Sequence, residues 1–248
     1  MARAALHRRL SWQAAAVLEV QPETARASRI VLDPPDWPGH RPGQHVDVRL
    51  TAPDGYTAQR SYSIASAPEA SHVELVVDRL PDGEVSPYLT QELRAGDELE
   101  VRGPFGGWFV WQVTMGGPLQ PIAGGSGVVL FLAMLDHHRA SGSEVPIRLL
   151  YSARSLAEVI RRQRLTEHQP GVRVDLALTR EAPPGWTGVS GRVDRAVLSR
   201  LAFPPEAEPQ VFVCGPTGFV DAVASAMIDL GHPSEKIKTE RFGATGGT

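Results

Sequence analysis

Cysteine, lysine and long apolar runs are all scarce in this sequence of 248 residues. The single cysteine, Cys214, rules out a disulfide within the sequence and any zinc or iron–sulfur site built from several of its own thiolates, so no metal site is predicted. No apolar run approaches the roughly 20 residues that a membrane-spanning helix needs. Residues 1–12 contain several arginines and too short an apolar run for a secretory signal. We therefore expect a cytoplasmic protein with no membrane contact.

The scarcity of lysine changes how the basic residues are interpreted. Lys236 and Lys238 are the only lysines among 25 basic residues, so arginine is common and none is assigned a function for its type alone. A net charge of −3 argues against a dedicated nucleic-acid-binding protein. The length suits one large domain or two of ordinary size, and 42% hydrophobic residues are enough for a sizeable core.

The first half of the sequence has the pattern of β-structure. Short alternating segments are separated by glycine and proline turns, and one short helix is predicted at 86–93. Strands are expected at 14–20, 27–32, 45–50, 56–64, 72–77 and 98–101, with 109–113 as a further candidate. This pattern predicts a six-stranded antiparallel barrel.

The second half alternates strands with helices after a linker at 115–118. Strands are predicted at 119–123, 147–152, 172–179 and 210–214, and helices at 128–138, 156–168, 192–201 and 217–230. Such alternation is typical of a doubly wound parallel sheet. The predicted division is a barrel domain at 1–116 and an α/β nucleotide-binding domain at 117–248.

The segment Arg60-Ser61-Tyr62-Ser63 combines a cation, an aromatic ring and two hydroxyls on the predicted strand 56–64. Because side chains alternate along a strand, Arg60 and Tyr62 are expected on one face and the two serines on the other. A guanidinium binds phosphate through paired hydrogen bonds, and a phenol ring can lie on a conjugated plane. The segment therefore suits a flat, charged ligand. The alternative is an ordinary barrel strand with an exposed arginine and a half-buried tyrosine.

A glycine-rich loop, Gly124-Gly125-Ser126-Gly127, lies between a predicted strand and a predicted helix. Glycines there let the backbone approach a pyrophosphate, although glycine also ends strands for steric reasons alone. In an open α/β sheet, ligands bind beyond the carboxyl ends of the strands. The segments 152–154, 179–180 and 214–216 are expected at the same edge, so all four would converge on one crevice.

Arginines at two of these strand ends favour a ligand with an extra phosphate. Ser152, Arg154 and Arg180 are expected where they can donate hydrogen bonds to a phosphate on a nucleotide ribose. The alternative is that both arginines are solvated loop residues. The arginines at 161, 162 and 164 are expected on a solvated helix face, with docking of an acidic partner as the alternative.

Several motifs follow one another along the chain: Arg60-x-Tyr62-Ser63, Gly83-x-x-Ser86-x-x-Leu89, Gly103-Pro104-x-Gly106, Gly124-Gly125-Ser126-Gly127, Tyr151-Ser152-Ala153-Arg154 and Cys214-Gly215-Pro216. In this order they resemble the ferredoxin–NADP reductase family, and the resemblance extends from about residue 45 to residue 242. It is strongest to stand-alone flavin reductases that end after Glu-Arg-Phe-Gly, here Glu240 to Gly243. Relatives that continue into a plant-type ferredoxin domain need a cysteine cluster that this sequence lacks.

The resemblance implies a role for each matching residue. Arg60 would bind a flavin phosphate, Tyr62 would lie against the isoalloxazine, and Ser63 would lie close to the flavin N5. Ser86, expected on independent grounds as a helix N-cap, would join Gly83 at the pyrophosphate. The full set of implied cofactor-binding residues is Arg60, Ser61, Tyr62, Ser63, Val77, Gly83, Val85, Ser86, Gly124, Gly125, Ser126, Gly127, Ser152, Arg154, Arg180, Cys214, Gly215 and Phe242.

The implied catalytic residues are Tyr62, Ser63, Cys214 and Glu240. In the family, Cys214 would lie near the nicotinamide and the Phe242 ring near the flavin, while Glu240 would assist proton movement. The alternative for Cys214 is a small buried hydrophobe with no part in the chemistry.

The activity implied by the resemblance is transfer of a hydride from NAD(P)H to FAD, followed by single-electron transfer to a ferredoxin or another iron–sulfur or haem protein. FAD is expected rather than FMN because residues 103–109 leave room for an adenosine arm. NADPH is expected rather than NADH because of the arginines at 154 and 180, and the protein is expected to be a monomer. The alternatives are a reductase of free flavin or small acceptors and a catalytically silent flavin-loaded subunit of a larger complex.

Two positions and one segment depart from the family pattern. Asp82 stands where a second glycine is frequent, and Leu130 stands where proline often follows the glycine-rich loop. Neither change threatens the fold. In the segment 159–162, relatives commonly have a phenylalanine and an acidic residue, which this sequence lacks. The difference bears on the surface that would bind the electron acceptor and not on hydride transfer.

Overall fold

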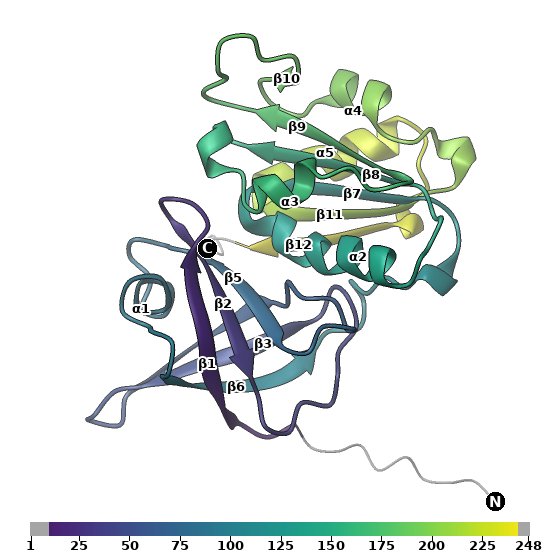
Figure 1. Cartoon of the computed structure of the whole chain (residues 1–248). Helices are drawn as coiled ribbons and strands as arrows, with labels where there is room; N and C mark the ends of the chain where they lie inside the picture. The colour runs from purple at the N-terminus through teal and green to yellow at the C-terminus, as the bar shows by residue number, and fades with distance from the viewer. Residues whose placement is uncertain (1–9, 243–248) are drawn as a thin grey trace, which may run out of the picture.

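Twelve strands form two separate sheets in the computed structural model, which describes residues 10–242 (Figure 1). The N-terminal sheet is antiparallel and curls into a barrel, and the C-terminal sheet is parallel and carries helices on both faces. The predicted fold class is therefore confirmed. Gly243 and residues 1–9, on which the expectations about the family's terminal motif and a secretory signal partly rest, lie outside the described residues.

The barrel has the strand order β4-β3-β6-β1-β2-β5. Its elements are β1 (Gln13–Pro22), β2 (Ala27–Asp33), β3 (His45–Thr51), β4 (Thr57–Ser63), β5 (Val73–Asp78), α1 (Ser86–Gln91) and β6 (Glu98–Phe105). An isolated bridge between Ile64 and Leu75 joins the two ends of the sheet and closes it. Alternate apolar side chains fill the interior, and Leu89 of α1 is fully buried among them.

The α/β domain has the strand order β10-β9-β8-β7-β11-β12. Its strands are β7 (Leu119–Gly124), β8 (Ile147–Ala153), β9 (Val172–Leu178), β10 (Val189–Ser190), β11 (Gln210–Pro216) and β12 (Ile237–Phe242), and its helices are α2 (Val129–Ala140), α3 (Arg162–Thr166), α4 (Arg195–Leu201) and α5 (Thr217–Asp229). α2 and α3 cover one face of the sheet and α4 and α5 the other (Figure 1). The strand order reverses at β7, which lies between β8 and β11, and ligands of such sheets bind at this switch point.

Two predicted elements are wrong. Residues 109–113 form no strand, because Phe109 and Trp111 are buried against the second domain, and the Trp111 backbone N–H donates to Pro42 O (3.2 Å) outside any sheet. The predicted helix 156–168 is interrupted after a short 3-10 turn (Leu156–Glu158), since Val159 and Ile160 turn into the core before α3 begins. The sequence pattern also missed the strands β10 and β12.

No helix within residues 10–242 is long and apolar enough to cross a membrane.

Four buried or half-buried histidines make stability depend on pH. Burial lowers the pKa of His40, His45, His138 and His232 below 6.5, the ordinary value. Below pH 6.5 the unfolded chain therefore binds more protons than the folded one, so the stabilisation is complete above that pH and is lost as the pH falls. We expect the free energy of unfolding, measured by urea titration, to fall by roughly 1–3 kcal/mol between pH 6.5 and 5.5. A constant value across this interval would contradict the expectation.

Candidate functional site

Arg60 and Tyr62 lie on β4, which pairs along its length with β3. The Arg60 guanidinium is mostly exposed, with 58% of its side chain accessible, and its Nη1 donates to the neighbouring Gln59 O (2.6 Å). Tyr62 is half-buried, and burial raises the pKa of its hydroxyl to about 12. β4 therefore presents a free cation beside an aromatic ring that stays neutral at physiological pH.

The two serines of this segment differ in their environment. The Ser61 hydroxyl donates to Asp47 Oδ1 (2.7 Å) on β3. Asp47 is buried, and it also pairs with Arg102 (3.0 Å) and accepts from Gln59 (3.2 Å). Ser61 is thus held by a network on the barrel wall, whereas Ser63 lies half-buried at the end of β4.

The structure around α1 corrects the expectation that Ser86 caps the helix. Val85, rather than Ser86, is the N-cap of α1, and the buried Ser86 Oγ accepts a hydrogen bond from Leu80 N–H (3.0 Å) instead of capping the helix. Val77 and Val85 have their side chains in the barrel core, so only their backbone atoms can meet a ligand. Gly83 lies tightly in the preceding turn, because a Cβ there would come within 3.1 Å of Ser86 Oγ and 3.2 Å of Leu80 O.

Tyr56 and Glu84 join Arg60 in a polar group that the sequence pattern did not identify. The Tyr56 hydroxyl donates to Glu84 Oε1 (2.7 Å), while Arg60 Nη2 lies 3.7 Å from Glu84 Oε2. All three side chains are exposed, so they can rearrange around a charged ligand. The acidic residue directly after Gly83 was the available signal for a partner of Arg60.

The glycine-rich loop lies tightly against the end of β11. A Cβ at Gly127 would come within 2.4 Å of Cys214 O, and one at Gly215 within 2.8 Å of the Phe219 ring. The same ring would meet a Cβ at Gly124 at 2.7 Å, so Phe219 is a further wall of the crevice that the sequence pattern did not reveal. Gly125 has a positive φ of 56° and open space beyond it. These glycines form a shallow backbone surface at the switch point of the sheet.

Cys214 and Glu240 are paired neighbours on β11 and β12. Burial raises the pKa of the Cys214 thiol well above 9.0, and the nearby Glu240 raises it further. Burial also raises the pKa of Glu240. At the carboxyl edge of the sheet, burial therefore disfavours the charged form of both groups.

The buried thiol should react slowly in the folded protein. The thiolate is the reactive form of cysteine. At Cys214 the raised pKa of the thiol disfavours the thiolate, and burial of the side chain keeps reagents away from the sulfur. With iodoacetamide at pH 8, we expect negligible labelling over a period in which the protein in 6 M guanidinium takes up one label. Because Cys214 is the single cysteine, mass spectrometry reads the result directly. Equal labelling rates in the two states would contradict the expectation.

The outer part of the crevice is more exposed. Ser152 on β8 pairs with Gly124 and is buried, while Arg154 is exposed and lies 3.9 Å from Glu158. Arg180 is exposed and forms no ion pair with any other residue in 10–242. Phe242, at the end of β12, is partly exposed beside Pro216.

One apolar cluster joins the barrel to this edge of the sheet. It holds Ala65, two residues beyond Ser63, together with Ala123, Val128 and Cys214. The barrel and the sheet edge that holds the glycine-rich loop therefore share one apolar core.

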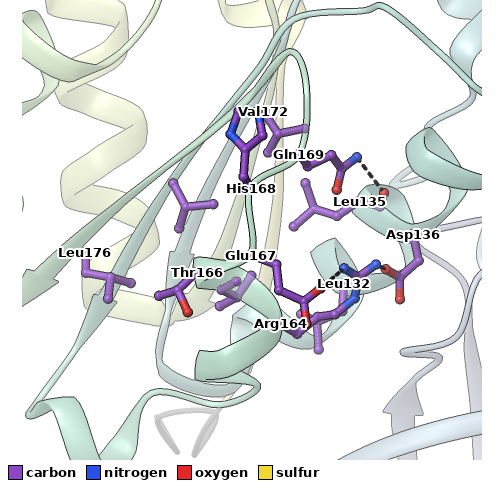
Figure 2. A pocket seen from close by; sticks show the side chains of 12 residues that line it. Leu132, Leu135, Asp136, Arg164, Thr166, Glu167, His168, Gln169, Val172 and Leu176 are labelled. Atoms are coloured by element: carbon purple, nitrogen blue, oxygen red, sulfur yellow. Dashed lines mark hydrogen bonds and ion pairs between the residues drawn. The ribbon is translucent and has the colours of Figure 1, made fainter.

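A separate cavity of about 360 Å³ lies away from this crevice (Figure 2). Its floor is the apolar face of β9 and α2, and Arg164 lies at its rim between Asp136 and Glu167 (2.9 Å to the latter). The expectation that Arg164 belongs to a solvated helix face is therefore wrong.

Comparison with known proteins agrees with this two-domain arrangement. Residues 19–110 match a family model described as an oxidoreductase FAD-binding domain, and residues 122–225 match an oxidoreductase NAD-binding domain. This chain belongs to the ferredoxin–NADP reductase family. The expected FAD and nicotinamide dinucleotide cofactors are thereby confirmed.

Individual members of the family are similar over most of the chain. The glycine betaine monooxygenase reductase subunit of Chromohalobacter salexigens is 33% identical over 83% of this chain, and a flavohemoprotein of Deinococcus radiodurans is 32% identical over 83%. The matches cover 56% and 52% of those proteins, so the chain spans about half the length of the curated relatives. The flavohem-like FAD/NAD-binding domain of a nitric oxide dioxygenase from Vibrio cholerae superposes with a TM-score of 0.83 at 25% identity, over 94% of this chain and 99% of that domain.

The site residues fit a flavin and a nicotinamide dinucleotide. Arg60 offers an exposed guanidinium whose one ion pair, with Glu84, is long (3.7 Å), the Tyr62 ring is partly accessible, and Gly124, Gly127 and Gly215 add no side chain at the sheet edge. Gly103 itself packs against β3, where a Cβ would lie 2.9 Å from Val46 Cγ1. Room for an adenosine arm along residues 103–109 stays a prediction.

Proposed function

We propose that this protein is an NAD(P)H-dependent flavin oxidoreductase that passes single electrons to a separate iron–sulfur or haem protein. The observation that carries the proposal is the apolar cluster that contains Ala65 and Val76 of the barrel together with Val128 and Cys214, because it packs the barrel against the edge of the sheet that holds the glycine-rich loop. Bound FAD would supply the conversion of a two-electron hydride donor into single electrons. The protein supplies binding, orientation and exclusion of water. The proposed division into functional units is 1–116 and 117–248.

The barrel residues would hold the flavin. The exposed Arg60 would bind its phosphate through charge-assisted hydrogen bonds, displacing the loose contact with Glu84. Tyr62 would pack against the isoalloxazine, and the Ser63 hydroxyl would lie near N5. Ser61 would support the strand through Asp47, and the backbone of Val77, Gly83, Val85 and Ser86 would line the pyrophosphate.

The sheet edge would hold the nicotinamide dinucleotide. Gly124, Gly125, Ser126 and Gly127 would accept its pyrophosphate against the backbone, with Gly215 keeping the space clear. Cys214 would lie beside the nicotinamide and Phe242 beside the flavin ring. Glu240, whose pKa is raised by burial, would assist proton movement beside them.

Ser152, Arg154 and Arg180 support a preference for NADPH. Both arginines are exposed and neither is committed to a close ion pair, so they are available to bind a ribose phosphate. We propose that the protein works as a cytoplasmic monomer with a ferredoxin or similar acceptor.

An anaerobic titration of the purified protein with NADPH and with NADH tests this function. We expect the visible flavin bands to bleach with NADPH at lower concentration than with NADH. Subsequent addition of a small iron–sulfur protein should restore them faster than an equal concentration of free FMN does. A colourless protein that takes up no flavin would contradict the proposal, and a yellow protein that NADPH does not bleach would favour a silent flavin-loaded subunit.

A further inference from the structure

Arg161 lies in the turn between residues 158 and 162, directly before α3, and contacts the barrel. Its Nη1 pairs with Glu23 Oε1 (3.1 Å), and its Nη2 lies 3.6 Å from Glu74 Oε1. Its backbone N–H donates to Glu23 Oε2 (3.3 Å) as well. Glu23 follows β1 in the hairpin that rises from the barrel, and Glu74 is on β5, so both contacts cross the domain boundary. The expected solvated role of Arg161 is therefore wrong.

The three side chains of this contact are largely removed from solvent. Their exposed fractions are 25% for Arg161, 14% for Glu23 and 17% for Glu74. Glu74 also accepts from Arg29 (2.9 Å), which pairs in turn with Glu19 (2.5 Å). Ion pairs shielded in this way are screened less by salt than exposed pairs, and a network holds its members in fixed positions.

The backbone of Arg161 supports a specific role. Its φ of 55° and ψ of 34° are left-handed, a conformation that is unfavourable for a non-glycine residue. Such strain persists only where the surrounding contacts over-determine the conformation. Here those contacts are the bonds from its N–H and guanidinium to the barrel.

The turn that carries Arg161 is also attached to the strand that holds a proposed nucleotide-binding residue. The Ile160 N–H donates to the Tyr151 hydroxyl (3.3 Å), which fixes the segment to β8 directly before Ser152. Arg161 follows Ile160 and fixes the other end to the barrel. The loop with Ser152 and Arg154 is thus attached to the barrel as well as to its own sheet.

Next to the apolar contacts of Val159 and Ile160, the interface beside Arg161 contains a hollow. A hollow of about 330 Å³ separates Ser66 and Glu69 of the barrel from Asp136 and Arg139 of α2, with Arg161 and Glu74 in its lining. A second contact between the domains joins His137 of α2 to Glu69 of the barrel (2.7 Å), and His137 carries charge only when protonated. At this part of the boundary, the permanent charges that hold the domains together are therefore those of Arg161 and its two glutamates.

We propose that Arg161 is a positioning residue, which fixes the nucleotide-binding loop to the barrel and so sets how closely the nicotinamide meets the flavin. The proposal rests on the proposed function. Hydride transfer is sensitive to displacement of the reacting atoms, and a shift of about 1 Å can change a rate by 100-fold. Loss of the contact should therefore slow flavin reduction without preventing either cofactor from binding.

The test compares Arg161→Gln with Arg162→Gln, a neighbouring exposed arginine without an ion pair to the rest of residues 10–242. In anaerobic stopped-flow experiments at saturating NADPH, we expect flavin reduction to slow at least about tenfold in Arg161→Gln. The NADPH dissociation constant and the flavin content should stay within twofold, and Arg162→Gln should match the wild type. A wild-type rate in Arg161→Gln, or a slower rate explained by lost cofactor, would overturn the proposal.

Amide hydrogen exchange supplies a readout that needs no turnover. Arg161→Gln should lose protection at residues 22–27 and 154–161, while the core of the barrel keeps its protection. Unchanged exchange in these segments would overturn the proposal even if the rate changed. If NADPH does not reduce the wild-type flavin, the proposed function fails, and the exchange experiment still decides whether Arg161 joins the domains.

Discussion

Replacing Gly127 with alanine is expected to lower the free energy of unfolding by about 1–3 kcal/mol. The added Cβ would lie 2.4 Å from Cys214 O and 2.6 Å from Cys214 C, closer than real contacts allow. Both atoms belong to the backbone of a central strand, so no side chain can rotate to relieve the overlap. The glycine-rich loop must move away from β11 instead, and NADPH should bind more weakly in the same variant. Urea unfolding and equilibrium titration with NADPH measure the two effects.

Gly218→Ala is the matched control. Gly218 lies in the first turn of α5, close to the crevice, and a Cβ there meets no atom within 4 Å. Alanine favours a helix over glycine by about 1 kcal/mol, so this variant should be as stable as the wild type or more so. Equal losses of stability in Gly127→Ala and Gly218→Ala would show that close approach to Cys214 is not the reason for Gly127.

Gly124→Ala should have an intermediate effect. The nearest atoms to its Cβ are on the Phe219 ring at 2.7 Å, and a ring at the crevice can shift where a backbone carbonyl cannot. The order of stability expected from urea unfolding is therefore Gly218→Ala, then Gly124→Ala, then Gly127→Ala. A reversed order would contradict the assignment of backbone contact to Gly127.

The fold could be predicted from the sequence because local patterns determine it. Alternating residues with glycine and proline turns indicated the barrel, and strands alternating with helices indicated the parallel sheet. The errors fall where tertiary contacts override local pattern. Residues 109–111 look like a strand, but their apolar side chains are buried between the domains without a strand partner.

The site was less predictable for the same reason. The motif residues on β4 and on the loop after β7 could be identified because they are close together in sequence. The role of Arg161 could not be, since it acts through partners distant in sequence, the glutamates of the barrel. In a sequence with this many arginines, the acidic partner of each arginine can be identified only from the three-dimensional structure.

Arg60→Ala is expected to weaken FAD binding by about 1.5–3 kcal/mol, which corresponds to roughly 10- to 150-fold in the dissociation constant. The wild-type guanidinium donates to the carbonyl of its own neighbour Gln59 and approaches Glu84 only at 3.7 Å, so its removal should leave the fold intact. Arg94→Ala is the control, because Arg94 is also exposed on the barrel and its side chain likewise donates to the carbonyl of its own neighbour, Leu93. Fluorescence titration of the flavin-free proteins measures the affinities.

Glu84→Gln tests the same placement from the opposite direction. Its carboxylate is the acidic group that approaches Arg60, and a flavin phosphate would have to replace it there. Glutamine keeps an acceptor for the Tyr56 hydroxyl but removes the competing charge, so FAD should bind with equal or higher affinity. If Arg60→Ala retained FAD as tightly as Arg94→Ala did, or if Glu84→Gln lost it, the phosphate would have to lie elsewhere on the barrel. The pair of variants therefore separates loss of a phosphate contact from general damage to this edge of β4.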